Sequence, residues 1–92
     1  MYHEYEISVV YTPTAQAFFG LRARGITSED ALLEALRALP RDLHPEFDPM
    51  EPEPSMLERA RKWAPLVSVI SITKLHREDV LDDLPAEWPR HA

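Results

Sequence analysis

The sequence has no cysteine and only two glycines, and each shortage removes classes of function. Without cysteine there is no disulfide scaffold, no thiolate zinc or iron–sulfur site and no cysteine nucleophile. The two glycines, Gly20 and Gly25, form neither a G-x-G-x-x-G nor a Walker pattern. Nucleotide binding through a glycine-rich phosphate loop is therefore excluded.

Side chains that carry catalysis or bind metals are few and scattered. No two of the four histidines have the i, i+4 spacing that places two zinc ligands on one helix face. They stand at His3, His44, His76 and His91. Ser28 and Ser55 precede or begin predicted helices, where capping explains them, and no nucleophile elbow is present. We therefore expect no enzyme activity, no metal site and no cofactor.

Long apolar runs are also missing. None approaches the roughly 18 residues that a membrane span requires. The first residues, 1–4, are polar and acidic, unlike the apolar stretch of a signal peptide. The sequence therefore predicts a cytoplasmic protein that does not bind membranes.

The chain does have the composition of a folded globular protein, with 45% apolar and 28% charged residues. Sixteen acidic residues outnumber ten basic ones, and the net charge is −6. Two segments, 42–54 and 78–87, each carry five carboxylates and no lysine or arginine. Nonspecific nucleic-acid binding depends on lysine and arginine, so this balance argues against it. It is compatible with a protein partner that has a basic surface.

The N-terminal part of the chain predicts a hairpin. Residues 5–11 alternate with period two and are rich in β-branched and aromatic side chains, which indicates a strand. A turn at 12–14 contains proline, and residues 15–24 are predicted as a second strand. A helix that starts at Thr14 is the competing interpretation, although Gly20 in its interior would cost about 1 kcal/mol relative to alanine.

A helix is predicted after this hairpin, between Thr27 and Pro40. Thr27 is placed to cap its N-terminus, with Asp30 three residues further on in a variant of the capping box. Apolar residues then recur at helical spacing on one face. This stripe consists of Ala31, Leu32, Ala35, Leu36 and Leu39.

The middle of the chain is rich in proline. Residues 40–54 contain five prolines and no glycine, so they are predicted to form an extended loop. Ser55 and Glu58 form an S-x-x-E capping box at the start of a second helix, which Pro65 ends.

The predicted fold is α+β, with a three-stranded antiparallel or mixed sheet and two helices packed on one face. Its third strand, 66–75, is apolar enough on both faces to lie inside the sheet, and 77–84 form a short helix. One domain covers 1–84 with the acidic loop at 40–54, and 85–92 form an irregular tail. Such a sheet has two open edges, so a homodimer is also predicted.

Two groups of aromatic and charged residues have competing interpretations. Alternation along the second strand places Phe18, Arg22 and Arg24 on one face, a pattern found in single-strand nucleic-acid platforms. Ion pairs with Glu6 across the hairpin explain the arginines as well, and we favour them. Trp63 is predicted to lie in the core. A second tryptophan follows Glu87 near the C-terminus, and it either packs back onto the domain or stays exposed as a contact residue.

The acidic loop at 40–54 is either a solvated linker or a partner-binding element. The second interpretation depends on a few apolar residues in the acidic segments that are suited to be anchors in an interface. A loop stiffened by proline also loses less entropy when it docks. The candidate partner-binding residues are Phe47, Asp48, Met50, Glu51, Glu53, Asp82, Asp83 and Trp88.

From these features we expect a small, acidic, non-enzymatic binding protein that acts as an adaptor or inhibitor through protein–protein contact. Small acidic proteins of phages and mobile elements often block basic nucleic-acid-handling machinery such as CRISPR effectors, an analogy of size and charge alone. The alternatives are a small enzyme or ligand-binding subunit with a site at a homodimer interface, and a structural oligomer subunit.

Overall fold

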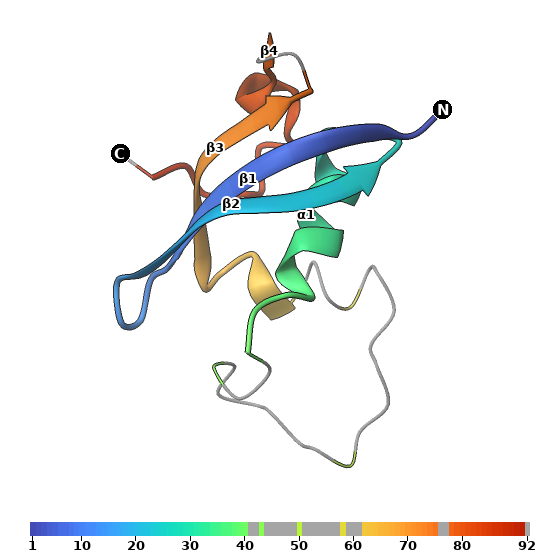
Figure 1. Ribbon diagram of the computed structural model, residues 1–92. Coiled ribbons are helices and arrows are strands. Elements are labelled where there is room, and N and C mark those ends of the chain that lie inside the picture. Colours follow the sequence, from blue (N-terminus) through green and yellow to red (C-terminus); the bar gives the residue numbers. More distant parts are fainter. Residues whose placement is uncertain (41–42, 44–49, 51–57, 59–61, 76–77, 92) are drawn as a thin grey trace.

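The computed structural model describes residues 1–40, 43, 50, 58, 62–75 and 78–91. Within this part, the chain forms an antiparallel sheet of four strands with one α-helix packed against it (Figure 1). Its elements, in chain order, are β1 (His3–Tyr11), β2 (Gln16–Gly25), α1 (Ser28–Leu36), β3 (Val67–Lys74), β4 (Glu78–Asp79) and the 3₁₀ turn η2 (Leu81–Asp83). The predicted α+β class is confirmed.

The predicted numbers of strands and helices differ from those in the structure. The sheet has four strands rather than three, because β4 forms where a short helix was expected to begin. Among the described residues of that region, the 3₁₀ turn η2 is the part that is helical. Most of the second predicted helix, from Ser55 to Pro65, lies outside the described residues, although Lys62 and Trp63 are helical.

The strand order is β2-β1-β3-β4, and every neighbouring pair is antiparallel. The period-two alternation of β1 buries Tyr5, Ile7, Val9 and Tyr11 in the core. Residues 16–25 are a strand, so the competing helix interpretation is wrong. The third predicted strand lies inside the sheet as expected, between β1 and β4.

A β-bulge in β2 changes which of its side chains share a face. Ile7 pairs with Leu21 but Val9 pairs with Phe18, so Phe19 and Gly20 together lie opposite Ser8. Gly20 has a φ of +66°, which glycine adopts without steric cost. Because of this extra residue, side chains an even number of positions apart no longer share a face of the sheet when the bulge lies between them.

The prediction that Phe18 shares a face with Arg22 and Arg24 is therefore wrong. Phe18 packs against the core together with Leu21, and Phe19 is left 71% exposed. The two arginines lie on the opposite side of the sheet, next to β1 carboxylates.

Helix α1 begins as the capping pattern predicts. The backbone N–H of Asp30 donates to the Thr27 hydroxyl oxygen at 3.2 Å, and the whole predicted apolar stripe is buried. The helix ends at Leu36, before the predicted end at Pro40. The backbone N–H groups that follow donate to the carbonyl three residues earlier, as in a 3₁₀ turn, and not to the carbonyl four residues earlier. Gly25 lies close to its first turn, and a Cβ atom there would be 2.5 Å from the Ala31 nitrogen.

The C-terminal segment packs along β3. The backbone N–H of Val69 donates to the Pro89 carbonyl at 2.8 Å, and the His91 N–H donates to the Val69 carbonyl at 2.9 Å. These bonds form a parallel bridge between Val69 and Arg90. The core between the sheet and α1 also contains the two tryptophans, Trp63 and Trp88, and so the core placement of Trp63 is confirmed.

Candidate functional site

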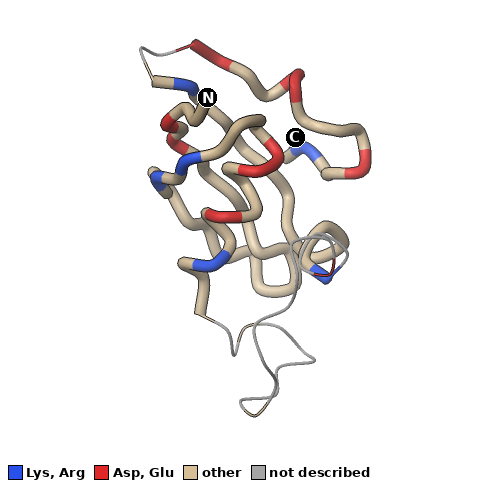
Figure 2. Tube along the Cα trace, turned by 90° about the vertical axis from the view of Figure 1, so that its right-hand side faces the viewer, with Lys and Arg blue, Asp and Glu red and all other residues tan. Residues whose placement is uncertain are grey.

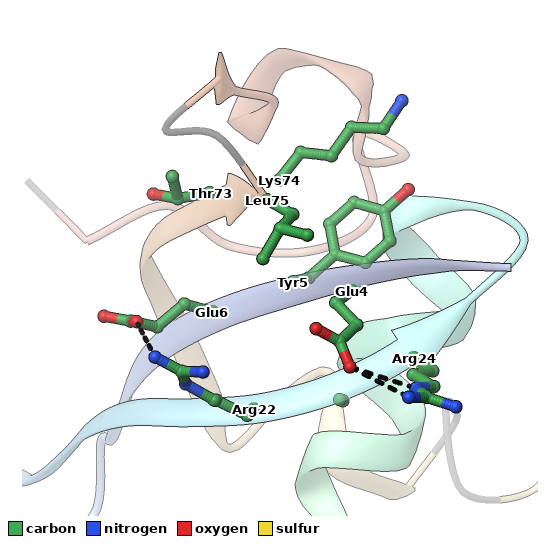
Figure 3. A pocket seen from close by; sticks show the side chains of 9 residues that line it. Glu4, Tyr5, Glu6, Arg22, Arg24, Thr73, Lys74 and Leu75 are labelled. Atoms are coloured by element: carbon green, nitrogen blue, oxygen red, sulfur yellow. Dashed lines mark hydrogen bonds and ion pairs between the residues drawn. The ribbon is translucent and has the colours of Figure 1, made fainter.

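A shallow hollow lies on the sheet where β1 begins, and it is lined by charged side chains from three strands (Figure 3). Its volume is about 450 Å³. The side chains around it include Glu4, Glu6, Arg22, Arg24, Thr73 and Leu75.

The arginines of this hollow are paired with carboxylates of β1. Arg24 Nη2 lies 3.0 Å from Glu4 Oε1, and Arg22 Nη2 lies 3.9 Å from Glu6 Oε2. Figure 3 shows both arginines reaching from β2 toward these carboxylates. The ion-pair interpretation of the arginines is thus confirmed, and Glu4 is a second, unpredicted partner. Charges that are neutralised in this way attract phosphate groups only weakly.

A second charged surface is formed by β4, η2 and the segment that follows, and we call it the C-terminal acidic face. Its side chains are exposed carboxylates, and none forms an ion pair within the described part of the chain. They are Glu78, Asp79, Asp82, Asp83 and Glu87. Figure 2 shows these acidic positions following one another along one end of the molecule. Of the five, Asp79 has a local structural role, because its Oδ1 accepts a hydrogen bond from the Leu81 N–H at 3.0 Å.

Arg90 follows this face in sequence, but its guanidinium group binds main-chain atoms. Nη1 donates to the Trp88 carbonyl at 2.6 Å, and Nη2 donates to the Leu84 carbonyl at 2.9 Å. Arg90 therefore fixes the backbone that carries Glu87, and it forms no ion pair with the acidic face in the described part of the chain. Sequence reasoning missed this residue, since no local pattern marks an arginine that binds backbone carbonyls.

Trp88 is packed into the core, so the first of its two interpretations applies. It is 2% exposed, and its indole Nε1 donates to Glu29 Oε2 of α1 at 2.8 Å. A buried indole N–H needs an acceptor, and the first turn of the helix supplies one. Trp88 therefore anchors the C-terminal segment, and its side chain is not at the surface for a partner to contact.

Tyr5 is a core residue of β1 that pairs with Lys74 of β3 across the sheet. The residue is 6% exposed. Burial is the main cause that raises the pKa of Tyr5 above its ordinary value, and the negative charges of Asp83, Glu78 and Asp30 add to it. Three carboxylates from three different elements therefore act on one phenol group.

Most of the candidate residues in the proline-rich loop lie outside the described residues, namely Phe47, Asp48, Glu51 and Glu53. Met50 is described and is 88% exposed. Asp82 and Asp83 are at the surface as expected. The structure therefore describes the C-terminal residues of the candidate site. Of these, Asp82 and Asp83 are at the surface and Trp88 is buried.

No group of three or more histidine, aspartate or glutamate side chains in the described part of the chain could hold a metal ion. In the same part, no helix is both long enough and apolar enough to cross a membrane. Comparison of the chain with protein-family models, curated proteins and solved structures gives no significant match.

Proposed function

We propose that the chain is a small, non-enzymatic binding protein of the cytoplasm that acts by contact with a protein partner whose surface is basic. The observation that carries this proposal is the C-terminal acidic face, where five exposed carboxylates have no ion-pair partner in the described part of the chain. Unpaired surface charges of one sign create a potential that attracts the opposite charge and speeds association.

The contrast with the hollow on the sheet supports this choice of surface. There, each carboxylate of β1 that faces β2 is close to an arginine. The acidic face is the described region where negative charge is left for a partner to neutralise. Its shape is also fixed, because Trp88 and Arg90 hold the segment against the core.

Proteins that handle nucleic acids carry basic surfaces that neutralise phosphate groups. An acidic protein that covers such a surface competes with the nucleic acid for it. We therefore propose an inhibitor or adaptor directed at such machinery, and the acidic loop residues Phe47, Asp48, Met50, Glu51 and Glu53 add a second contact.

The test compares two variants with the same change of charge. In the first, Asp82→Asn, Asp83→Asn and Glu87→Gln neutralise the acidic face, and Asp79 is kept because it supports the backbone. In the second, Glu4→Gln, Glu6→Gln and Glu34→Gln remove three carboxylates that are paired in the structure. Each tagged chain is used to capture proteins from a lysate of its native host, which are then identified by mass spectrometry.

We expect the wild type and the second variant to capture the same basic protein, and the first variant to lose it. Capture should fall steeply as salt is raised, because exposed charges are screened beyond about 8 Å at physiological ionic strength. Equal capture by both variants, or capture that does not depend on salt, would contradict the proposal.

A second candidate function is that of an oligomer subunit, which the free edge of β2 favours. Among the described strands, β2 pairs with β1 alone, and Phe19 on this strand is 71% exposed. A second copy that adds its own β2 would extend the sheet. Sedimentation that gives a mass near 10.6 kDa at high micromolar concentration would eliminate this candidate.

A further inference from the structure

The face of the sheet opposite the core carries its charges in two rows of opposite sign. We call it the outer face, and its side chains are those that alternate with the buried positions of β1 and β2. Glu4 and Glu6 form an acidic row along β1, and Arg24 and Arg22 form a basic row along β2, each arginine opposite one carboxylate. Figure 3 shows the two rows side by side.

The ion pairs of the outer face are open to solvent and keep capacity for further bonds. The side chains of Arg22 and Arg24 are 79% and 74% exposed. Arg22 Nη2 lies 3.9 Å from Glu6 Oε2, which is too far for a hydrogen bond, and both bonds from Arg24 go to Oε1 of Glu4. Because a guanidinium group has five N–H donors and a carboxylate has two acceptor oxygens, each pair can bond a second pair.

The outer face also allows two copies of the chain to approach without repulsion between like charges. The whole chain has a net charge of −6, so two copies repel each other in most orientations. The two rows contain two carboxylates and two guanidinium groups, and their charges cancel. Such a surface attracts neither a basic nor an acidic partner strongly. It is complementary to a surface that has the same two rows in the reverse order.

A second copy of the chain supplies this reversed order by symmetry. A two-fold axis that runs along the strands, between β1 and β2, places β1 of each copy over β2 of the other. Glu4 then lies over Arg24 of the second copy, and Glu6 lies over its Arg22. A two-fold axis across the strands would instead place Glu over Glu and Arg over Arg. The charge pattern therefore selects one arrangement of two sheets that pack face to face, an arrangement that symmetric dimers commonly use.

Phe19 adds an apolar contact to the same face. It is 71% exposed, and alternation places it on the outer face because its neighbour Phe18 packs against the core. In β2 it lies at the level of Ser8 of β1. The axis between these strands brings the ring over β1 of the second copy, where it loses contact with water. The hollow of about 450 Å³ above β1 leaves space for the arginines of that copy.

We propose that the outer face is the interface of a symmetric homodimer in which the two sheets pack face to face and the acidic row of each copy contacts the basic row of the other. This inference is independent of the proposed function, because the C-terminal acidic face takes no part in the contact. It also differs from extension of the sheet at the free edge of β2, because β1 contributes half of the charges.

The experiment reverses one row at a time and measures the mass by sedimentation equilibrium at low salt and high micromolar concentration. We expect the wild type to approach twice 10.6 kDa. Arg22→Glu with Arg24→Glu makes the face wholly acidic, and Glu4→Arg with Glu6→Arg makes it wholly basic, so each double variant alone should be a monomer. An equimolar mixture of the two should recover the dimer mass, and added salt should lower the dimer fraction.

Matched variants separate this interface from general effects of charge and apolar surface. Glu34→Arg makes the same charge change as Glu6→Arg in another exposed ion pair, on α1, and should leave the dimer unchanged. Phe19→Ala should weaken dimerisation about tenfold, as expected for an aromatic residue inside an interface. Ile26→Ala, at a residue that is 55% exposed between β2 and α1, should have no effect.

Each result decides the question. A wild type that stays at 10.6 kDa would overturn the proposal, and so would double variants that remain monomers when they are mixed. If Glu4→Arg with Glu6→Arg dimerises like the wild type, the copies meet at the edge of β2 and the outer face is not the interface. If circular dichroism shows that a double variant does not fold, the single reversals Arg22→Glu and Glu6→Arg are mixed in the same way. Capture of a basic protein by the acidic face is a separate measurement, which none of these outcomes changes.

Discussion

The N-terminal hairpin and the C-terminal acidic face carry the same kinds of acidic residue but use them differently. In the hairpin, the register places Glu4 beside Arg24 and Glu6 beside Arg22. Such exposed pairs contribute only about 0–1 kcal/mol each, but they leave little unbalanced charge. On the acidic face, carboxylates such as Asp82 and Glu87 have no such partners in the described part of the chain. The comparison shows that the partner across the sheet, and not the residue type, decides whether a carboxylate is available to another protein.

The largest effect should come from the anchor that holds the acidic face in place. Replacement Trp88→Ala removes a buried ring and leaves Glu29 without its donor, so we expect the free energy of unfolding to fall by about 3–5 kcal/mol. Urea denaturation measures this change, with Trp88→Phe as a milder control that keeps most of the packing. A loss below about 1 kcal/mol would show that the ring is not part of the core.

In the hairpin, an added methyl group should lower the free energy of unfolding by different amounts at the two glycines. Gly25→Ala places a Cβ atom 2.5 Å from the Ala31 nitrogen, so the start of α1 must shift, and we expect a loss of about 3 kcal/mol. Gly20→Ala meets its nearest atom at 3.8 Å but forces alanine to a φ of +66°, and we expect a loss of about 1 kcal/mol. Thermal unfolding of the two variants checks this order, and the reverse order would contradict the packing of Gly25.

Alkaline pH should reveal the negative charge around Tyr5. Because the pKa of Tyr5 is raised in the folded chain, the unfolded chain loses this proton first. The contribution of Tyr5 to stability is therefore complete below the ordinary tyrosine pKa of about 10 and is lost as pH rises through the folded value. Phenolate absorbance should give a lower pKa for Tyr5 in Asp83→Asn and no change in Asp82→Asn.

The Tyr5→Phe variant identifies which of the tyrosine titrations belongs to this residue. If Asp82→Asn and Asp83→Asn shift the same titration equally, the charge that acts on Tyr5 comes from the whole face and not from Asp83.

The smallest effects should have opposite signs in the two regions. Neutralising Asp82 and Glu87 together relieves repulsion and should raise stability by at most about 0.5 kcal/mol. Neutralising Glu4 removes the partner of Arg24 and should lower it by about 0.2–1 kcal/mol. Chemical denaturation at low salt can resolve the two signs, and high salt should reduce both effects. Equal signs would mean that the two groups of carboxylates do not differ in the way described.

Sequence reasoning worked where a local pattern determines the structure. The alternation of β1 and the Thr27 cap are set by neighbouring residues, and both are as predicted. Pairing of Arg22 with Glu6 follows from placing the two strands in a hairpin. All three features depend on contacts within one strand, one helix start or one hairpin, so a local sequence pattern is enough to predict them.

The features that were missed depend on distant contacts or on single residues. The bulge at Gly20 moves Phe18 to the other face, and a glycine alone does not say whether it marks a bulge or a bend. β4 has two residues, too few to show a period. The burial of Trp88 depends on Glu29, which lies 59 positions earlier in the chain.

The parallel bridge between Val69 and Arg90 also bears on how the chain folds during its synthesis. β1 and β2 are adjacent in sequence, so their hairpin can close as soon as both strands have left the ribosome. β3 is synthesised later than this hairpin. It gains its last backbone hydrogen-bond partners only when Pro89 and His91 have emerged. A nascent chain stalled before Trp88 would leave the core residues that pack against this ring exposed, and it should be a substrate for chaperones until Trp88 has emerged.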